Sequence, residues 1–333
     1  MRRTLLFALS LLAAPALAAA AGPDFTQHGP LDVGRRIVRW TKASETTGEP
    51  RVLDTLIWYP AAAGSGSRDQ TTENAPVARG HWPVILFSHG SCGVPGQSPF
   101  YVETLASWGF VVAAPPHPGN QTVDPECRGG RDEGAIADSF ANRVADIRFV
   151  LDQLVAASQD AGSPFFRRID PRRVGASGHS FGGQTTLRVA AADPRVKAAV
   201  ALAPAAPSGI TVRTPTMILA AELDSLTRWE TAIARSYALL AGPRFLVELK
   251  NTGHCAFALL CARAFCGDGC EPGTLDLETA HDLTLYYALP FFLQYVAGNG
   301  RFEDRILPGA EPAFAVVHQA VPGTLPVGRL PTR

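Results

Sequence analysis

The sequence has no excess of charge of either sign, no internal repeat and, beyond its first 21 residues, no apolar run long enough to span a membrane. Its 333 residues include 30 basic and 30 acidic side chains, so the formal net charge at pH 7 is zero. Nucleic-acid-binding surfaces and electrostatic docking on anionic membranes both need a concentration of positive charge. We therefore expect no nucleic-acid partner and no stable insertion into a membrane.

The one long apolar run lies at the N-terminus. Two arginines precede the run TLLFALSLLAAPALA, which contains an Ala-x-Ala pattern at positions 16–18 and continues in small residues to Ala21. This order is typical of a secretory signal peptide, whereas a membrane anchor needs a longer apolar core. No cysteine stands near the cleavage region to carry a lipid. We expect residues 1–21 to be a signal peptide and the mature chain to be exported, either to the periplasm or out of the cell.

The mature chain has an even number of cysteines and no obvious metal motif. An even count in an exported protein favours disulfides, although six cysteines allow fifteen pairings. The cluster CARAFCGDGC has no CxxC and no histidine at ligand spacing, so it does not favour zinc. We expect a local bridge behind residue 254 and a longer one between Cys255 and either Cys92 or Cys127. The six cysteines are Cys92, Cys127, Cys255, Cys261, Cys266 and Cys270.

Short apolar runs predict eight strands. Residues 35–40 and 52–60 alternate in part, which indicates an antiparallel pair at an edge. Six near-continuous apolar runs follow, as expected of parallel strands buried on both faces: PVILFSHG, FVVAAPPH, RRVGASGHS, VKAAVALAP, TPTMILAAE and RFLVELKN. Helices are predicted between them at 99–108, 134–157, 181–192, 228–241 and 279–297.

This alternation of strands and helices is typical of an α/β fold. We expect an eight-stranded, mostly parallel sheet with helices on both faces, built from residues 22–305 as one domain. The proline-rich residues 306–333 are predicted to be a tail without a strand. The helix at 134–157 has the clearest pattern, because its apolar residues recur every three or four positions and form one stripe.

The stretch GASGHSFGGQ, residues 175–184, places Ser180 between Gly178 and Gly182, with Gly183 directly behind. It ends the fifth predicted strand and begins a predicted helix, and a sharp strand-to-helix turn needs small neighbours. The helix N-terminus adds N–H groups and a positive dipole, which favour negative charge developing near the serine oxygen. A plain turn serine would not require three glycines in this arrangement. The stretch predicts Ser180 to be a nucleophile.

A serine nucleophile needs a histidine base that is held by a carboxylate. His254, in NTGHCAF, directly follows the eighth predicted strand, and no other histidine beyond Ser180 follows a strand end. Asp224 lies on the turn after the seventh strand, and Glu222 lies two residues earlier. Asp224 is favoured because the turn places it further out from the strand end, while Glu222 stays open as the alternative. The pattern predicts a triad of Ser180, Asp224 and His254.

The tetrahedral intermediate of such a reaction also needs two hydrogen-bond donors for its oxyanion. The backbone N–H of Phe181, the residue after the nucleophile, is one expected donor. The other is expected from the loop SHGSCG after the third strand, where we favour the Ser91 N–H over that of Cys92. This chemistry needs no metal and no cofactor, and we expect neither.

The order Ser, Asp, His along the chain is that of the α/β-hydrolases. In addition, LFSHGSCG, SWGFVVAAPPHPGN, DIRFVLDQL and GHSFGGQT resemble the α/β-hydrolase branch that contains predicted dienelactone hydrolases and platelet-activating-factor acetylhydrolase-like lipases and esterases. The early LIWYP strand fits the same branch, and AAELD resembles the acid turn of bacterial cutinase-like polyester hydrolases. The resemblance covers about residues 35–300. It implies an α/β-hydrolase fold and a serine carboxylic-ester hydrolase that acts through an acyl-enzyme.

Two features limit what the resemblance implies about the substrate. Dienelactone hydrolases proper use a cysteine nucleophile where this chain has Ser180, and residues 255–279 form a cysteine-rich insertion directly behind the predicted base. We expect a small-molecule or polymeric ester as substrate. An exported amidase or peptide-degrading hydrolase with the same triad is the alternative, and an inactive binding protein of the same fold is a minor one.

Four aromatic residues near the predicted site are candidates to line an apolar substrate pocket. Pockets and cores share this composition, so each is also a candidate for the core. They are Phe100, Tyr101, Trp229 and Phe257.

Overall fold

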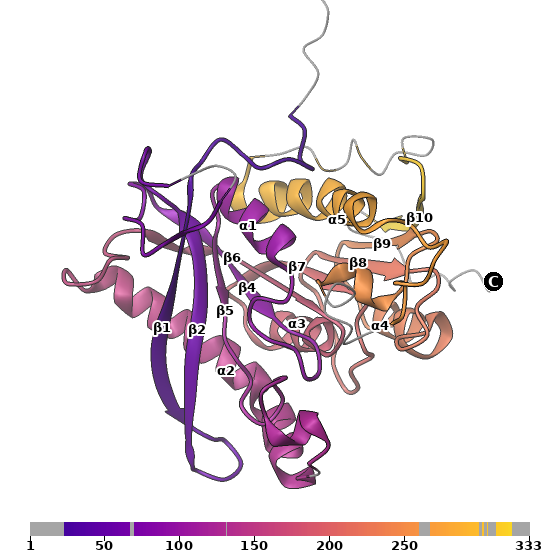
Figure 1. Ribbon diagram of the computed structural model, residues 1–333, viewed down its shortest axis with the longest axis horizontal. Helices are drawn as coiled ribbons and strands as arrows, with labels where there is room; N and C mark the ends of the chain where they lie inside the picture. Colours follow the sequence, from indigo (N-terminus) through magenta and orange to yellow (C-terminus); the bar gives the residue numbers. More distant parts are fainter. Residues whose placement is uncertain are drawn as a thin grey trace, which may run out of the picture.

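A mixed sheet of ten strands forms the centre of the molecule (Figure 1). The computed structural model describes residues 23–66, 70–130, 132–259, 267–299, 302, 305 and 311–321. The predicted signal peptide, Cys261, Cys266 and most of the predicted tail lie outside the described residues. The strands stand in the order β10-β9-β8-β7-β6-β4-β5-β2-β1-β3, so β4 and β5 exchange places relative to their order in the chain.

The central strands β4 to β9 run parallel to one another, while β1, β2 and β10 add antiparallel pairs at the two edges. The mostly parallel sheet predicted from the apolar runs is confirmed. The strands are β1 (Val33–Ala43), β2 (Pro50–Pro60), β3 (Thr72–Glu73), β4 (Trp82–Ser88), β5 (Val111–Ala114), β6 (Ile169–His179), β7 (Val196–Leu202), β8 (Thr216–Ala221), β9 (Arg244–Leu249) and β10 (Ala315–Val321).

Two strands were not predicted. Strand β3 is two residues long and, among the described residues, pairs with β1 alone, so no sequence pattern of useful length marks it. Strand β10 lies in the segment predicted to be a tail without a strand, and it pairs antiparallel with β9 through a register irregularity between Val317 and Gln319. Its short alternating run is surrounded by prolines, which concealed it.

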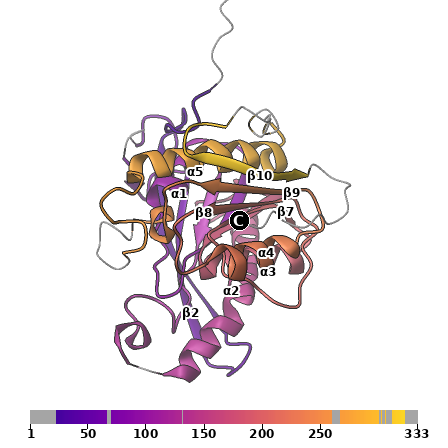
Figure 2. The ribbon, with the colours of Figure 1, turned by 90° about the vertical axis from the view of Figure 1, so that its right-hand side faces the viewer.

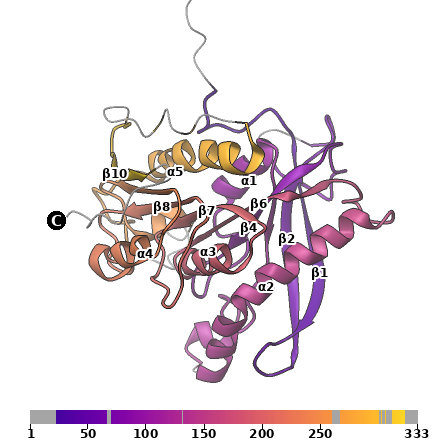
Figure 3. The same cartoon turned by 180° about the vertical axis from the view of Figure 1, so that it is seen from behind.

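The helices cover both faces of the sheet, as Figures 2 and 3 show from the side and from behind. On one face lie α1 (Pro99–Ser107), α5 (Leu277–Phe292) and the π-helical turn η5 (Leu293–Ala297). On the other lie α2 (Glu133–Gln159), α3 (Phe181–Ala192), the π-helical turn η2 (Trp229–Ile233) and α4 (Ala234–Ala238). Short 3₁₀ turns stand at η1 (Pro125–Arg128) and η3 (His254–Phe257).

Each face of the sheet has its own apolar core. Leu105 and Tyr287 belong to the core under α1 and α5, whereas Ile147 and Leu187 belong to the core under α2 and α3. This arrangement explains why the central strands read as near-continuous apolar runs: successive side chains point into different cores. Within the described ranges, none of the helices is both long and apolar enough to cross a bilayer.

Because the central strands are parallel, the loops that follow β4, β5, β6, β8 and β9 all emerge at the same side of the sheet, beyond the carboxyl ends of the strands. These loops carry Ser91, Asn120, Ser180, Asp224 and His254, respectively. Residues far apart in the sequence are thereby brought together at this side.

Candidate active site

Ser180 lies at the turn that joins β6 to α3, in a conformation that serine rarely adopts. Its φ is 59° and its ψ is −119°, so it has a positive φ without being glycine. Such a backbone costs about 1–3 kcal/mol and persists only where the surroundings enforce it. The strained turn projects the side chain outward from the end of the sheet, as a nucleophile on such a turn requires.

The glycines around Ser180 are required by close packing. A side chain on Gly182 would collide with the carbonyl oxygen of Ser88, at the end of β4, and one on Gly178 would meet the same oxygen. A side chain on Gly183 would press on Pro204. The three glycines therefore let the turn approach the neighbouring strand and loop.

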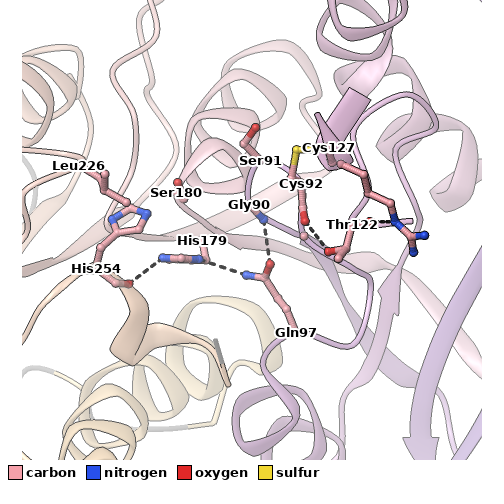
Figure 4. A pocket seen from close by; sticks show the side chains of 12 residues that line it. Gly90, Ser91, Cys92, Gln97, Thr122, Cys127, His179, Ser180, Leu226 and His254 are labelled. Carbon is pink, nitrogen blue, oxygen red and sulfur yellow. Dashed lines mark hydrogen bonds between the residues drawn. A yellow bond between two sulfur atoms is a disulfide. The ribbon is translucent and has the colours of Figure 1, made fainter. Parts of the chain in front are cut away.

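His254 begins η3 directly behind β9, and its ring is held by Asp224. The distance from His254 Nδ1 to Asp224 Oδ2 is 2.7 Å, and both side chains are buried. Because the carboxylate can only accept, His254 Nδ1 carries a proton and Nε2 is left as the basic nitrogen. His254 and Ser180 line the same pocket, where Figure 4 shows Ser180 between the His254 ring and Gly90.

The turn after β8 satisfies the Asp224 carboxylate on both oxygens. Oδ1 accepts the backbone N–H groups of Leu226 and Thr227, at 2.9 and 2.6 Å, and Oδ2 accepts the Thr227 hydroxyl at 2.6 Å as well as the His254 N–H. Burial alone would raise the pKa of Asp224, but the hydrogen bonds from His254 and Thr227 together hold the pKa below its usual value. The carboxylate is therefore charged at neutral pH.

Glu222, the alternative acid, is engaged elsewhere. Its carboxylate accepts the Asn251 N–H at 2.8 Å and forms an ion pair with Lys250. The structure thus pairs His254 with Asp224 and brings Glu222 to the first residues behind β9. The catalytic role of either acid is not tested by this geometry and stays a prediction.

The loop behind β4 holds the Gly90–Ser91 peptide in one orientation at the wall of the pocket. The Gly90–Ser91 peptide has its carbonyl oxygen bound by Arg143 and by the His89 ring, at 3.2 and 2.8 Å. Because a trans peptide points its N–H away from its carbonyl oxygen, the Ser91 N–H faces the opposite side. The Cys92 N–H, by contrast, donates to Asn120 Oδ1 at 3.3 Å. Of the two donors considered from the sequence, Ser91 therefore fits the role better.

Arg143, on α2, is the buried cation that fixes this loop. Its guanidinium donates to the carbonyl oxygens of His89 and Gly90 and to Asn120 Oδ1, at 2.6, 3.2 and 2.6 Å. It also lies over the Phe181 ring, 4.8 Å from the centroid. Burial lowers the pKa of Arg143 to about 9, so the group keeps its charge at pH 7. One cation thus joins the loop behind β4 to the first residue of α3.

We expect Arg143→Met to lower the free energy of unfolding by about 1–3 kcal/mol, because the buried His89 carbonyl oxygen loses its donor, while the Gly90 and Asn120 oxygens keep a second one. The turnover number should fall as well, since the Gly90–Ser91 peptide is released. Denaturant unfolding and steady-state kinetics measure the two effects. Arg148→Met, which removes a half-exposed arginine from the same helix, is the matched control and should change both by little; equal effects of the two variants would contradict this role.

The pocket around Ser180 has a volume of about 540 Å³, a size that suits a small-molecule ligand. Twelve residues line it: Gly90, Ser91, Cys92, Gly93, Gln97, Thr122, Cys127, Arg128, His179, Ser180, Leu226 and His254. Leu226 is 63% exposed, which leaves an apolar side chain at the mouth beside the base. Among the described residues, no group of three or more His, Cys, Asp or Glu side chains is placed to hold a metal ion.

None of the four aromatic candidates is among these lining residues. Tyr101 and Phe257 are fully buried in the core, and Tyr101 bonds Ser177 through its hydroxyl. Phe100 stacks on His281 at 3.6 Å between centroids, and Trp229 packs against His318. Their positions on elements that flank the site made them candidates, but Phe257 reaches the pocket only through His179, against which its ring packs. A direct contact with substrate stays a prediction.

The disulfide pairing differs from the one expected. Cys92 is bonded to Cys127, not to Cys255, and this bridge joins the loop behind β4 to η1. Backbone contacts explain the pairing. Gly93 and Gln121 form an isolated parallel β-bridge, so the loops behind β4 and β5 run side by side there. Cys255 and Cys270 are also disulfide-bonded, so the segment behind His254 is cross-linked as predicted.

Four polar residues around the site were not predicted. They are Gln97, Asn120, Arg143 and Thr227. A signal existed for Arg143, which lies three residues after Phe140 and four before Ile147 and therefore shares the apolar stripe of its helix. The others lie in loops, where no periodicity marks them.

Known proteins are similar to this chain in fold and in sequence. Residues 100–262 match the family model described as PET hydrolase-like, and residues 43–124 match the one described as Platelet-activating factor acetylhydrolase, isoform II. The solved structure of a ferulic acid esterase from Streptomyces cinnamoneus has a TM-score of 0.69, covering 88% of this chain and 98% of that one at 21% identity. The chain has the α/β-hydrolase fold. The resemblance stated from its motifs is confirmed.

Two curated proteins are similar to this chain in sequence. Lipase 1 of Moraxella sp. (strain TA144) is 30% identical over 185 residues, which are 52% of this chain and 51% of the relative. Cutinase 2 of Thermobifida cellulosilytica is 31% identical over 153 residues, which are 45% of this chain and 51% of the relative. The chain therefore matches about half the length of each of these relatives.

Proposed function

We propose that this α/β-hydrolase is a serine carboxylic-ester hydrolase that acts through an acyl-enzyme on Ser180. The observation that carries the proposal is the arrangement of Ser180 and His254 in one pocket, with His254 bonded to the buried Asp224 carboxylate at 2.7 Å. An outward-facing serine, a histidine with one basic nitrogen and a charged orienting carboxylate are the groups that acyl transfer requires.

In the first half of the reaction, Ser180 Oγ attacks the carbonyl carbon of the ester and forms a C–O bond while its proton moves to His254 Nε2. The carbonyl oxygen becomes an oxyanion, which the N–H groups of Ser91 and Phe181 stabilise. Asp224 stabilises the resulting imidazolium. The intermediate then collapses: the bond to the alcohol oxygen breaks, His254 gives that oxygen its proton, and the alcohol leaves.

In the second half, water replaces the alcohol. His254 takes a proton from the water as it attacks the acyl carbon, and the same two N–H groups stabilise the second oxyanion. The bond from the acyl carbon to Ser180 Oγ then breaks, and the proton on His254 returns to the serine. The enzyme is regenerated and the acid leaves, so neither a metal nor a cofactor is needed for the balance of the reaction.

The relatives support an ester as the substrate. They bear the names lipase, cutinase and ferulic acid esterase, and a family model described as PET hydrolase-like matches part of the chain. The open mouth beside Leu226 is compatible with a small ester or with one end of a polymer. We further propose that the chain acts after export, because disulfides such as Cys92–Cys127 persist in oxidising compartments.

The test is hydrolysis of p-nitrophenyl acetate and butyrate by the purified protein, together with trapping of the nucleophile. A fluorophosphonate should inactivate the enzyme at one equivalent, and mass spectrometry should find the adduct on the peptide that contains Ser180. Heat-denatured protein, which lacks the triad geometry, is the control for both readings. Absence of turnover above this control would overturn ester hydrolysis as the function, and absence of the adduct would overturn Ser180 as the nucleophile.

An amide library assayed on the same preparation separates ester hydrolysis from amide hydrolysis, which uses the same triad. We expect turnover of esters to exceed that of matched amides. A chain-length series of esters, extended to an aromatic polyester film, then measures how large an acyl group the pocket admits.

A further inference from the structure

A chain of buried hydrogen bonds connects the loop of the base to the loop of the oxyanion donor. His179, which directly precedes Ser180, places its Nε2 3.0 Å from the carbonyl oxygen of His254. Its Nδ1 lies 3.1 Å from Gln97 Nε2, and Gln97 Oε1 accepts the Gly90 N–H at 3.0 Å. Figure 4 shows these bonds as one line beneath Ser180. His179 and Gln97 are 1% and 3% exposed, so water does not compete for their bonds.

Only one assignment of protons satisfies every bond in this line. The His254 carbonyl oxygen can only accept, so His179 Nε2 carries the proton and its Nδ1 accepts from the Gln97 amide group. The Gln97 oxygen is then left to accept from Gly90, whose backbone N–H can only donate. Burial lowers the pKa of His179 to about 3, which agrees with a neutral ring that carries a single proton. All three hydrogen bonds are therefore donated in one direction, from the Gly90 N–H toward the His254 carbonyl oxygen.

The backbone around Gln97 strengthens the same connection. The Gln97 carbonyl oxygen accepts the Leu259 N–H at 2.8 Å, so main chain and side chain of one residue hold the segments on both sides of the pocket. Gly93 leaves the space that the Gln97 carboxamide fills, because a side chain there would collide with its oxygen. At the other end, the His89–Gly90 peptide is bound on both sides, its oxygen by Arg143 and its N–H by Gln97.

We propose that His179 and Gln97 are positioning residues that set the base His254 and the oxyanion donor Ser91 at a fixed separation across Ser180. The proposal rests on the proposed function of the site. Gly90 directly precedes Ser91, and the His254 carbonyl belongs to the same residue as the base, so each end of the line acts on one reacting group. Both side chains line the pocket, but the proposed role acts through the Gly90 and His254 backbone and not through contact with the substrate.

Loss of the hydrogen bonds through His179 and Gln97 should lower the turnover number with little change in KM. Complete loss of an oxyanion donor costs about 10²–10³-fold in kcat, so a displaced donor should cost about 10–100-fold. Binding of the ground-state ester does not use the oxyanion position, which keeps KM within about threefold. A general loosening of the fold would instead change KM, stability and kcat together.

The experiment compares four variants on one p-nitrophenyl ester. Gln97→Met and His179→Leu remove the donors and acceptors but keep much of the volume, and both should show the loss of kcat. Because the two residues act through one line, the double variant should lose little more than either single one. His179→Gln keeps one acceptor and one donor and should recover part of the lost turnover.

Ser98→Ala is the matched control. Ser98 is adjacent to Gln97 and fully buried, and its hydroxyl bonds the Phe257 carbonyl oxygen at 2.8 Å, yet it contacts neither Gly90 nor His254. This variant should keep kcat within about threefold of the wild type. Equal losses in Ser98→Ala and Gln97→Met, additive losses in the double variant, or no recovery in His179→Gln would overturn the proposal.

A measurement on the unmodified enzyme keeps the proposal separate from the proposed function. Nitrogen-15 NMR of histidine-labelled protein should show His179 neutral with its proton on Nε2 between pH 5 and 8; a proton on Nδ1 would overturn the proposal. If no ester is turned over, the proposed function fails, and the rate of fluorophosphonate labelling at Ser180 replaces kcat in the same comparison of variants.

Discussion

Replacing Ser180 with alanine is expected to reduce kcat for p-nitrophenyl butyrate by about 10⁵-fold or more, and His254→Ala should cause a loss of similar size. In the proposed mechanism the two side chains act in a single proton transfer, so either one without the other should be ineffective. The double variant should therefore be no slower than the single variants. Residual activity over the uncatalysed reaction should persist, because the proposed oxyanion donors, the Ser91 and Phe181 N–H groups, are kept in both variants.

Steady-state kinetics and the fluorophosphonate adduct check this prediction together. Ser180→Ala should lose the adduct entirely, while His254→Ala should keep the serine but react slowly. Ser236→Ala, which removes a buried serine from α4 outside the pocket, is the matched control and should retain activity. Multiplicative losses in the double variant would mean that the two residues do not act as a unit.

Ser180→Ala should also stabilise the fold slightly or leave its stability unchanged. Alanine meets the same strain as serine at a φ of 59°, so the strain remains. No hydrogen bond of the Ser180 hydroxyl supports the turn within the described part of the chain, and the backbone N–H still bonds the Leu202 carbonyl oxygen at 2.8 Å. A loss of activity in this variant can therefore be read as chemistry and not as unfolding.

The residues that follow strand ends could be located from the sequence. Ser180, Asp224 and His254 each stand directly behind an apolar run, and parallel strands bring their carboxyl ends to one edge. Near-continuous apolar runs for the central strands and the three- and four-residue spacing of the helices are enough for that deduction. The sharp turn at Ser180 could be predicted as well, because three glycines at the junction of a strand and a helix indicate a close approach of backbone to backbone.

The buried polar network could not be located in this way. Gln97 is 82 positions from His179 in the sequence, and nothing in either local pattern indicates their contact. The predicted pairing of Cys255 with Cys92 or Cys127 was wrong for a related reason. The Cys92–Cys127 bridge depends on the loops behind β4 and β5 being neighbours, which follows from the strand order and not from cysteine spacing. Strand β10 likewise depends on the exposed edge of β9, which only the assembled sheet presents.

Replacing Asp224 with asparagine is expected to lower kcat by about 10⁴-fold while KM changes little. The amide oxygen can still accept the Leu226 and Thr227 N–H groups, so the amide nitrogen takes the place of Oδ2 and faces His254 Nδ1. Two donors cannot bond each other. The imidazole therefore carries its proton on Nε2. This nitrogen can then no longer accept the proton of Ser180.

Glu222→Gln is the matched control, since it makes the same chemical change two residues earlier on the turn. Glu222 contacts Lys250 and the Asn251 N–H, so its loss should leave kcat within about threefold of the wild type. Nitrogen-15 NMR of His254 should show the proton on Nδ1 in the wild type and on Nε2 in Asp224→Asn. If Glu222→Gln were the slower variant, the acid of this site would be Glu222, and the 2.7 Å contact of Asp224 with His254 would be structural.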